Sequence, residues 1–160
     1  MEYKNLERVL DEFGKEFVRV LSRLITDEQG IASGNLLDTI ESEGCFYRHE
    51  NGHYTVYLGH PDYFEYYDKG TRPHWAPIQP LKDWVEAKQA KGMLPQVDGL
   101  PYMIQWKIAR DGTEARNVFD KAKQEVIPHF VDRFAEALRD DMIDNWLSGE
   151  DWTNWGIFKV

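Results

Sequence analysis

The sequence has a single cysteine, Cys45, among its 160 residues, so no disulfide can form within the chain. We expect Cys45 to be an inert, partly buried thiol in a protein of a reducing compartment. Long apolar runs are also missing: none approaches the roughly 20 residues of a membrane-spanning helix, and the charged N-terminus lacks the pattern of a signal peptide. These absences predict no membrane partner, and a protein that is used in a cytosol or built into a particle there.

Basic residues are scarce relative to acidic ones. The chain has 19 Lys and Arg against 28 Asp and Glu, which gives a net charge of −9 at pH 7. This balance argues against tight electrostatic capture of nucleic acid, which needs several Lys or Arg side chains on phosphates. It is compatible with a ring through which DNA passes without specific binding, because a mildly negative lumen of such a ring repels the phosphates. The same charge also serves simple solubility, whatever the function.

Catalytic and nucleotide-binding motifs are missing as well. The sequence contains no G-x-S-x-G, P-loop or G-x-G-x-x-G motif, and Cys45 lacks the context of a nucleophile. A catalytic zinc ion needs three converging ligands and an open position, but no H-E-x-x-H or C-x-x-C spacing occurs. The histidines are therefore expected to be solvated or core side chains: His49, His53, His60, His74 and His129. We expect no enzyme activity, no metal and no cofactor.

One alternative of a different class stays open, a carbohydrate-binding module or a hydrolase. The chain has six tryptophans, and sugar-cleaving enzymes use pairs of carboxylates. Three such pairs occur: Asp62 with Glu65, Asp140 with Asp141, and Glu150 with Asp151. Against this reading, Asp140 and Asp141 are expected on the rim of a helix beside Arg139, where charge is usually solvated.

The hydrophobic content is high enough for a core. With 42% hydrophobic and 14% aromatic residues, a chain of this length forms one domain that buries about 68–70% of its unfolded surface. Apolar residues recur at helical spacing over residues 6–25, which predicts an amphipathic N-terminal helix. Gly14 lies inside this helix and costs about 1 kcal/mol relative to alanine. Its presence favours a close approach of another element at that point.

A longer helical pattern covers residues 118–147. A helix of this length runs to roughly 45 Å, longer than a small domain is wide, so part of it should project or meet a neighbour. Its apolar residues are read as one continuous stripe that ends with Leu138, Met142 and Trp146. Pro128 removes one backbone hydrogen bond and should kink the helix.

The middle of the chain predicts a small sheet. Residues 46–50 and 53–58 flank Asn51-Gly52, the strongest short hairpin signal, whose two-residue turn places Glu50 opposite His53. The aromatic density here predicts a sheet face covered by the long helices. Residues 63–67 fit either a third strand or a short helix. Shorter helices are expected over residues 36–40, where Ser33 could serve as the cap, and over 102–108, ending near Gly112.

A constrained corner and a helix follow at residues 68–88. Gly70 can adopt a positive φ at little steric cost, while Pro73 and Pro77 each fix φ and remove a backbone donor. Pro80 suits a first helical position, where its missing N–H had no partner. Trp84 then lies on the apolar edge of a short amphipathic helix.

The segment Arg72-Pro73-His74-Trp75 at this corner allows two interpretations. It could fold onto its own core, with Trp75 or Trp84 buried and Arg72 paired with a carboxylate such as Glu65 or Asp68. Alternatively, it is presented to the next subunit, since Trp, Tyr and Arg dominate interface hot spots. Both interpretations hold if Trp84 points into the core and Trp75 points to the surface.

The last twelve residues, 149–160, form an aromatic tail beyond the long helix. Its large apolar residues include Trp152, Trp155 and Phe158. A flexible terminus is normally polar, and an apolar one more often adds to a sheet edge of its own or of a neighbouring subunit. We therefore treat the tail as a candidate intersubunit segment, separate from a domain at residues 1–148.

Three patches of the sequence resemble one known family. Gly70-Thr71-Arg72-Pro73-His74-Trp75-Ala76-Pro77, followed by Pro80-Leu81-x-x-Trp84-Val85, is similar to the "Gly-Thr-Arg-Pro" and "Pro-Leu-x-x-Trp" segments of the tail-completion or neck proteins of tailed bacteriophages. Residues 108–119 resemble the family's "Ile-Ala-x-x-Gly-Thr-x-Ala-x-x-x-Phe", and residues 33–40 its "Thr-Gly-x-Leu-x-x-Ser-Ile". The patches occur in the family's order, but Asn117-Val118 stands where "Arg-Pro-Phe" is common, and the loop from Lys91 to Leu100 is expanded.

The resemblance implies a structural virion protein at the head–tail junction or the top of the tail, assembled in the host-cell cytoplasm. It implies a homo-oligomeric ring around the DNA channel, with other neck, portal or tail-tube proteins as partners. We expect an α+β fold, with a small antiparallel sheet packed against the N-terminal and the long C-terminal helix. The corner is assigned to Gly70, Thr71, Pro80 and Trp84, and the candidate subunit interface to Arg72, Pro73, His74, Trp75, Trp152, Trp155 and Phe158.

Overall fold

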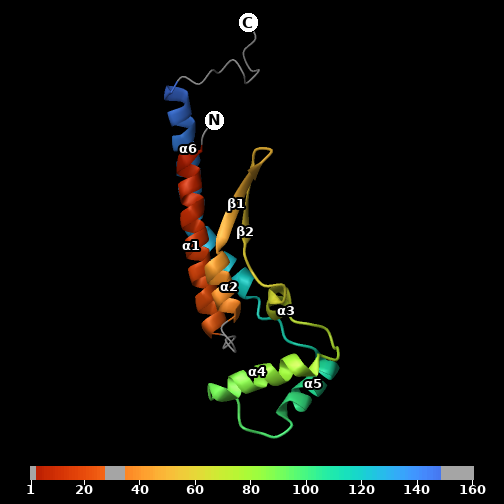
Figure 1. Cartoon of the computed structure of the whole chain (residues 1–160). Coiled ribbons are helices and arrows are strands. Elements are labelled where there is room, and N and C mark those ends of the chain that lie inside the picture. The colour runs from red at the N-terminus through yellow and green to blue at the C-terminus, as the bar shows by residue number, and fades with distance from the viewer. Residues whose placement is uncertain (1–2, 28–34, 149–160) are drawn as a thin grey trace.

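The computed structural model describes residues 3–27 and 35–148 and has an α+β fold (Figure 1). Its elements in chain order are α1 (Lys4–Asp27), α2 (Asn35–Glu43), β1 (Cys45–Glu50), β2 (His53–Leu58), α3 (Phe64–Lys69), α4 (Ile78–Ala90), α5 (Leu100–Asp111) and α6 (Val118–Leu147). The predicted fold class is confirmed: a small antiparallel sheet accompanies an N-terminal helix and a long C-terminal helix. The expected cap Ser33 and the tail residues Trp152, Trp155 and Phe158 lie outside the described residues.

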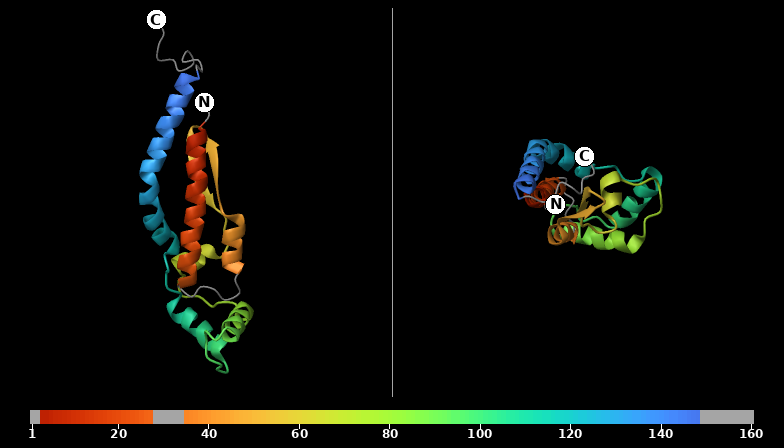
Figure 2. Two further views of the ribbon diagram at one scale, coloured as in Figure 1. Left: turned by 90° about the vertical axis from the view of Figure 1, so that its left-hand side faces the viewer. Right: turned by 90° about the horizontal axis from the view of Figure 1, so that it is seen from above.

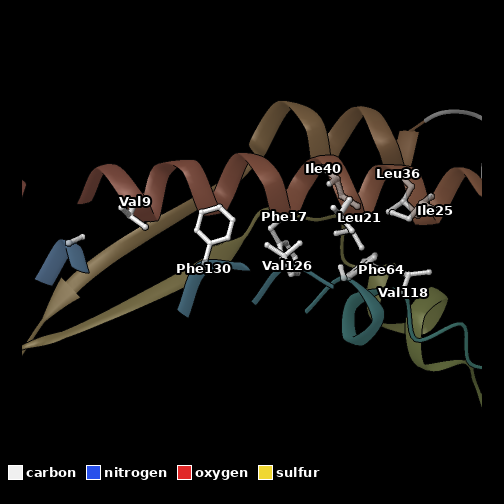
Figure 3. Close-up of a cluster of buried hydrophobic side chains, with 13 residues drawn as sticks. Val9, Phe17, Leu21, Ile25, Leu36, Ile40, Phe64, Val118, Val126 and Phe130 are labelled. Atoms are coloured by element: carbon white, nitrogen blue, oxygen red, sulfur yellow. The ribbon is translucent and has the colours of Figure 1, made fainter. Parts of the chain in front are cut away.

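The core lies between α1 and α6, which run antiparallel along the length of the molecule (Figure 2). The predicted helices over residues 6–25 and 118–147 are both confirmed. Their facing sides bury Phe17 of α1 near Val126 and Phe130 of α6, and further along α1 the core includes Ile25, which lies beside Leu36 of α2 (Figure 3). Burying each such side chain contributes about 1.5–3 kcal/mol, so this interface is the main stabilising contact of the fold.

Two buried aspartates bind the N-termini of the long helices. The Asp141 carboxylate of α6 accepts hydrogen bonds from the backbone N–H groups of Asn5 and Leu6, both at 2.8 Å, and so caps the N-terminus of α1. At the other end, the Asp68 carboxylate of α3 accepts the N–H of Phe119 in the first turn of α6 at 3.1 Å. Both aspartates are 2% exposed. Each satisfies donors that a helix start leaves unpaired, and a carboxylate there also interacts favourably with the helix dipole.

The hairpin has the predicted register, with Glu50 opposite His53. Asn51 and Gly52 both have positive φ, 52° and 77°, as a type I′ turn requires. The hairpin packs on α1, and Gly14 allows the close approach: a Cβ at this position would lie 3.0 Å from the Cβ of Cys45. The expected close contact at Gly14 is therefore confirmed.

The remaining helices divide between the body and a separate lobe. α2 adds Leu36 and Ile40 to the core, and the ambiguous residues 63–67 belong mainly to helix α3. The helix expected over residues 102–108 is α5, and Gly112 follows its end as predicted. α4 and α5 pack on each other and lie beyond the end of α1 that finishes at Asp27 (Figure 1). We call this helical pair the α4–α5 lobe.

α6 departs from the sequence reading in one respect: its apolar residues do not form one buried stripe. Ala122, Val126 and Phe130 are buried, whereas Met142 and Trp146 are 54% and 62% exposed. Residues four positions apart advance by slightly more than one turn, because a helix has 3.6 residues per turn. An apolar pattern with this spacing therefore moves around the helix axis and leaves the face that α1 covers. The helix is continuous through Pro128 and follows a curved path (Figure 2).

The final turn of α6 extends past the start of α1 (Figure 2). Asp141 marks the level at which α1 begins, because its carboxylate caps that helix. Leu147, beyond this level, is 73% exposed. The expected projection of the long helix is thus present. Within residues 3–27 and 35–148, no helix combines the length and the apolar character needed to cross a bilayer.

Candidate interaction surfaces

The corner at residues 70–77 is held by a second Gly-Thr pair, Gly112-Thr113. Thr71 and Thr113 form an antiparallel bridge in which each N–H donates to the other's carbonyl, at 3.1 and 3.0 Å. Their hydroxyl oxygens lie 3.0 Å apart. The bridge brings together two of the three sequence patches that resemble the phage family, a pairing that no local signal predicts.

Only glycine fits the two positions that precede these threonines. Gly70 has φ 71° and ψ −177°, and Gly112 has φ 75° and ψ −158°, a region of backbone conformation that is essentially restricted to glycine. A Cβ at Gly70 would lie 2.3 Å from the carbonyl oxygen of Thr113, and one at Gly112 would lie 2.1 Å from that of Thr71. The expected positive φ of Gly70 is confirmed, and glycine is required here because the backbone of residues 113–115 lies so close.

The rest of the corner is fixed to α5. The N–H of His74 donates to the carbonyl of Ile108 at 3.4 Å, and the side-chain amide of Gln105 donates to the carbonyl of Ala76 at 2.7 Å. The His74 Nδ1 atom lies 2.9 Å from the carbonyl oxygen of Arg72. These contacts hold the backbone of residues 72–76 in place, while the Arg72, Pro73, His74 and Trp75 side chains remain exposed.

Two details of the corner differ from the sequence reading. α4 begins at Ile78, so Pro80 is its third residue and not its first; proline is tolerated here because N–H groups of the first turn have no helical partner. Trp84 does not point inward: it is 38% exposed, and its ring contacts the ammonium group of Lys88, 5.7 Å from the ring centroid. Val85 occupies the buried position of this helix instead.

The surroundings of Arg72 and Trp75 distinguish between the two interpretations of residues 72–75. The Asp68 carboxylate binds the start of α6 and lies 3.3 Å from the Lys69 ammonium group. Among the described residues, no ion pair joins Arg72 to Asp68 or Glu65. Trp75 is 68% exposed. The segment therefore presents its tryptophan to the surface, while its backbone is held by α5.

The α4–α5 lobe adds an aromatic surface that the sequence reading missed. α5 has no buried residue, and its large side chains Tyr102, Met103 and Trp106 are 55%, 62% and 58% exposed. Cations lie over both aromatic rings of α5, Lys82 over Tyr102 at 5.3 Å and Arg110 over Trp106 at 5.3 Å. The signal was present as apolar residues at helical spacing, but a short amphipathic helix is normally read as facing its own core.

A second exposed surface lies on α6. We call it the α6 outer face; it consists of five uncharged residues spaced by four or seven positions, and all are between 41% and 62% exposed: Ile127, Val131, Leu138, Met142 and Trp146. It lies on α6 beside the face that packs on α1. α6 therefore has two apolar faces, of which the described chain covers one.

The carboxylates considered for sugar chemistry are engaged in other contacts, are exposed, or lie outside the described residues. Asp141 was expected to be solvated on a helix rim, but it is buried and caps α1, which places it out of reach of a substrate. Its neighbour Asp140 is exposed and pairs with Arg139 at 2.9 Å. Asp62, which precedes α3, and Glu65, which lies in its first turn, are both exposed. Glu150 and Asp151 lie outside the described residues.

The histidines and the cysteine show no shared site. Among residues 3–27 and 35–148, no group of three or more His, Cys, Asp and Glu side chains is placed to hold a metal ion. His49 stacks on Tyr54, with ring centroids 4.2 Å apart. Cys45 is half-buried, as expected, and burial raises the pKa of its thiol to about 11. A thiol with such a pKa is a poor nucleophile at neutral pH.

Comparison with known proteins returned no relative. No protein-family model, no curated protein and no solved structure matches the chain.

Proposed function

We propose that this chain is a structural protein of a tailed-bacteriophage particle, located at the head–tail junction or the top of the tail and assembled in the host-cell cytoplasm. In this role it forms a homo-oligomeric ring around the DNA channel and contacts other neck, portal or tail-tube proteins. DNA passes through without specific binding, in keeping with the net charge of −9. The three sequence patches that resemble the tail-completion and neck proteins motivate this assignment.

The observation that carries the proposal is the presence of two separate exposed apolar surfaces on one elongated chain. One is the corner with the α4–α5 lobe, and the other is the α6 outer face. A soluble monomer rarely exposes large apolar patches, and such patches usually mark contacts with other molecules. A cyclic ring needs two different surfaces per subunit, because its contacts are heterologous.

Deletion of the gene from the phage genome that encodes it tests the proposal. We expect full heads and separate tails that do not join, and restoration of infectious particles by the wild-type gene in trans. Mass spectrometry of purified particles should detect the chain, and electron microscopy should place it at the junction. Normal joined particles from the deletion strain would refute the proposal.

The carbohydrate alternative predicts a different outcome for the exposed tryptophans. We expect Trp75→Ala and Trp155→Ala to reduce the incorporation of the chain into particles, with no glycan binding by the wild-type protein on a glycan array. Binding of a defined glycan by the wild type, and its loss in these variants, would favour the sugar-binding alternative.

A further inference from the structure

We propose that α5 of one copy packs on the α6 outer face of the next copy, in a head-to-tail contact that repeats around the assembly. This inference builds on the proposed ring, since it names the pair of surfaces that a ring contact would use. Three observations support it: the described residues leave one side of α5 exposed, they leave one face of α6 exposed, and the parts of the chain that contain these two helices differ in net charge.

The first surface is the exposed side of α5. A 12-residue helix is marginally stable on its own and normally gains its stability by burying an apolar face. α5 packs on α4, yet none of its residues is buried. Tyr102, Met103 and Trp106 are each more than half exposed. Tyr, Met and Trp are enriched at protein interfaces, where one tryptophan often carries much of the binding energy.

The second surface is the α6 outer face. It runs from Ile127 to Trp146, a rise of roughly 30 Å at 1.5 Å per residue, and so offers room for the roughly 18 Å length of α5. The lobe lies at the end of the molecule where α6 begins, and the outer face extends from there toward the opposite end (Figure 2). Within residues 3–27 and 35–148, one copy does not bring its own α5 onto this face, so the face is exposed to a second copy.

The charge distribution favours this pairing. Residues 70–112, which contain the corner and the lobe, have six basic and four acidic residues, a net charge of +2. The rest of the chain holds the other 13 basic and 24 acidic residues, a net charge of −11. α6 has four basic residues and, apart from the buried Asp141, six acidic ones, which gives its surface a net charge of −2. Complementary charge selects the orientation of a contact and speeds association.

The same charges argue against a symmetric dimer through α6. That arrangement would place two helices side by side whose surfaces each have a net charge of −2, and like charges at an interface are unfavourable. In the head-to-tail arrangement the positive lobe meets the negative helix. Each bound copy then still offers one α5 and one α6 outer face, so the contact repeats until a ring closes.

Cysteine cross-linking tests the pairing directly. Two variants are made in a Cys45→Ala background, one with Met103→Cys on α5 and one with Leu138→Cys on α6, and one of them carries a mass tag. The mixture is oxidised at high protein concentration and analysed by non-reducing electrophoresis. We expect the mixed α5–α6 dimer to exceed either homodimer by about tenfold, as heterologous contact requires.

The doubly substituted chain extends this test. With both cysteines on one chain, head-to-tail contact should produce a ladder of covalent oligomers instead of dimers alone. A mixture in which the Leu138→Cys homodimer dominates, or in which no cross-link forms at any protein concentration, would overturn the proposal. The Cys45→Ala protein without added cysteines serves as the blank.

A double variant that reverses two charges on α5 tests whether electrostatic attraction contributes to the contact. Lys107→Glu with Arg110→Glu reverses the two basic residues of α5, and also breaks the ion pair of Arg110 with Asp111. It should lower the yield of the mixed cross-link by about tenfold. The matched control reverses two exposed basic residues on α1, Arg8→Glu with Lys15→Glu, and should leave the yield within about twofold. Equal losses in both variants would contradict the assignment of α5 as the positive partner.

Different results would refute the α5–α6 contact and the proposed function in a phage particle. Cross-linking of purified protein without any of the chain in phage particles would sustain the α5–α6 contact and refute the virion assignment. A chain that is present at the head–tail junction, but whose cysteines at 103 and 138 do not cross-link in the particle, would sustain the virion assignment and refute the contact.

Discussion

Asp140 and Asp141 are adjacent and chemically identical, yet they have opposite environments. Asp140 is exposed and pairs with Arg139. Asp141 is buried and accepts two backbone hydrogen bonds at the start of α1, together with one from the Asn5 side chain at 3.0 Å. A buried donor that loses its acceptor costs more than an exposed ion pair contributes. The two residues therefore make a matched pair for mutation.

We expect Asp141→Ala to lower the free energy of unfolding by about 2–4 kcal/mol, because it removes a helix cap and leaves buried N–H groups unpaired. Asp140→Ala should change it by less than about 0.5 kcal/mol, since exposed ion pairs contribute little. Urea unfolding followed by circular dichroism measures both values. Equal effects of the two substitutions would mean that the cap is not a stabilising contact.

Glycines at the corner offer a second test at the residue scale. Gly70→Ala combines a positive φ with a Cβ that would lie 2.3 Å from the Thr113 carbonyl oxygen. Gly92 has a similar φ of 69° but no atom within 4 Å of such a Cβ. Gly92→Ala should therefore cost only the conformational penalty of about 1–2 kcal/mol.

We expect Gly70→Ala to cost at least about 1 kcal/mol more than Gly92→Ala, because backbone atoms must move to admit the methyl group. The urea midpoints give the difference, and faster hydrogen exchange at the N–H groups of Thr71 and Thr113 would locate it at the bridge. Similar losses in the two variants would show that the close approach at Gly70 is relieved at no cost.

At the scale of the elements, α6 is defined by its two apolar faces. Phe130 is 5% exposed and contacts Phe13 of α1, with ring centroids 5.4 Å apart. Val131, the next residue, is 55% exposed on the α6 outer face. Substitutions at these two adjacent residues can therefore distinguish the role of α6 in folding from its proposed role in binding.

We expect Phe130→Ala to destabilise the chain by about 3–5 kcal/mol, the usual cost of removing a phenylalanine from a core. Val131→Ala should change the stability by less than about 0.5 kcal/mol, as for most surface positions. Thermal unfolding measures the stability, and the mixed cross-link of Met103→Cys with Leu138→Cys measures the contact. A Val131→Ala variant that unfolds as easily as Phe130→Ala would show that this face is already covered within the monomer.

On the scale of the whole molecule, the chain consists of a packed body and a less protected lobe. The body holds the α1–α6 core with α2, α3 and the hairpin, whereas the lobe joins it through the two linking segments of the Thr71–Thr113 bridge (Figure 1). Regions with few buried apolar contacts open locally at low free energy. α5, which has no buried residue, is the clearest case.

We expect native-state hydrogen exchange to show the amides of α5 opening at a free energy several kcal/mol below that of the α1 and α6 amides, as for other weakly packed segments. Assembly should reduce the difference, because the proposed contact covers α5. Mass spectrometry of the monomer and of the cross-linked oligomer provides the comparison. Equal protection of α5 and α6 in the monomer would show that the lobe and the body unfold as one unit.

Local sequence signals determined the elements of this chain. Asn51-Gly52 predicted the hairpin and its register, because a two-residue turn requires positive φ at both positions. Apolar residues at helical spacing predicted both long helices, and Gly14 predicted a close contact. These predictions succeeded because the forces that they describe act between residues that are near in the sequence.

Contacts between distant segments were decided only by the tertiary structure. Two Gly-Thr pairs meet at residues 70–71 and 112–113, and Asp141 caps a helix that begins more than 130 residues earlier. No local signal distinguishes Asp141 from Asp140, or shows that Trp84 turns outward. Which face of a helix is covered depends on where its partner lies, and that geometry exists only once the chain has folded.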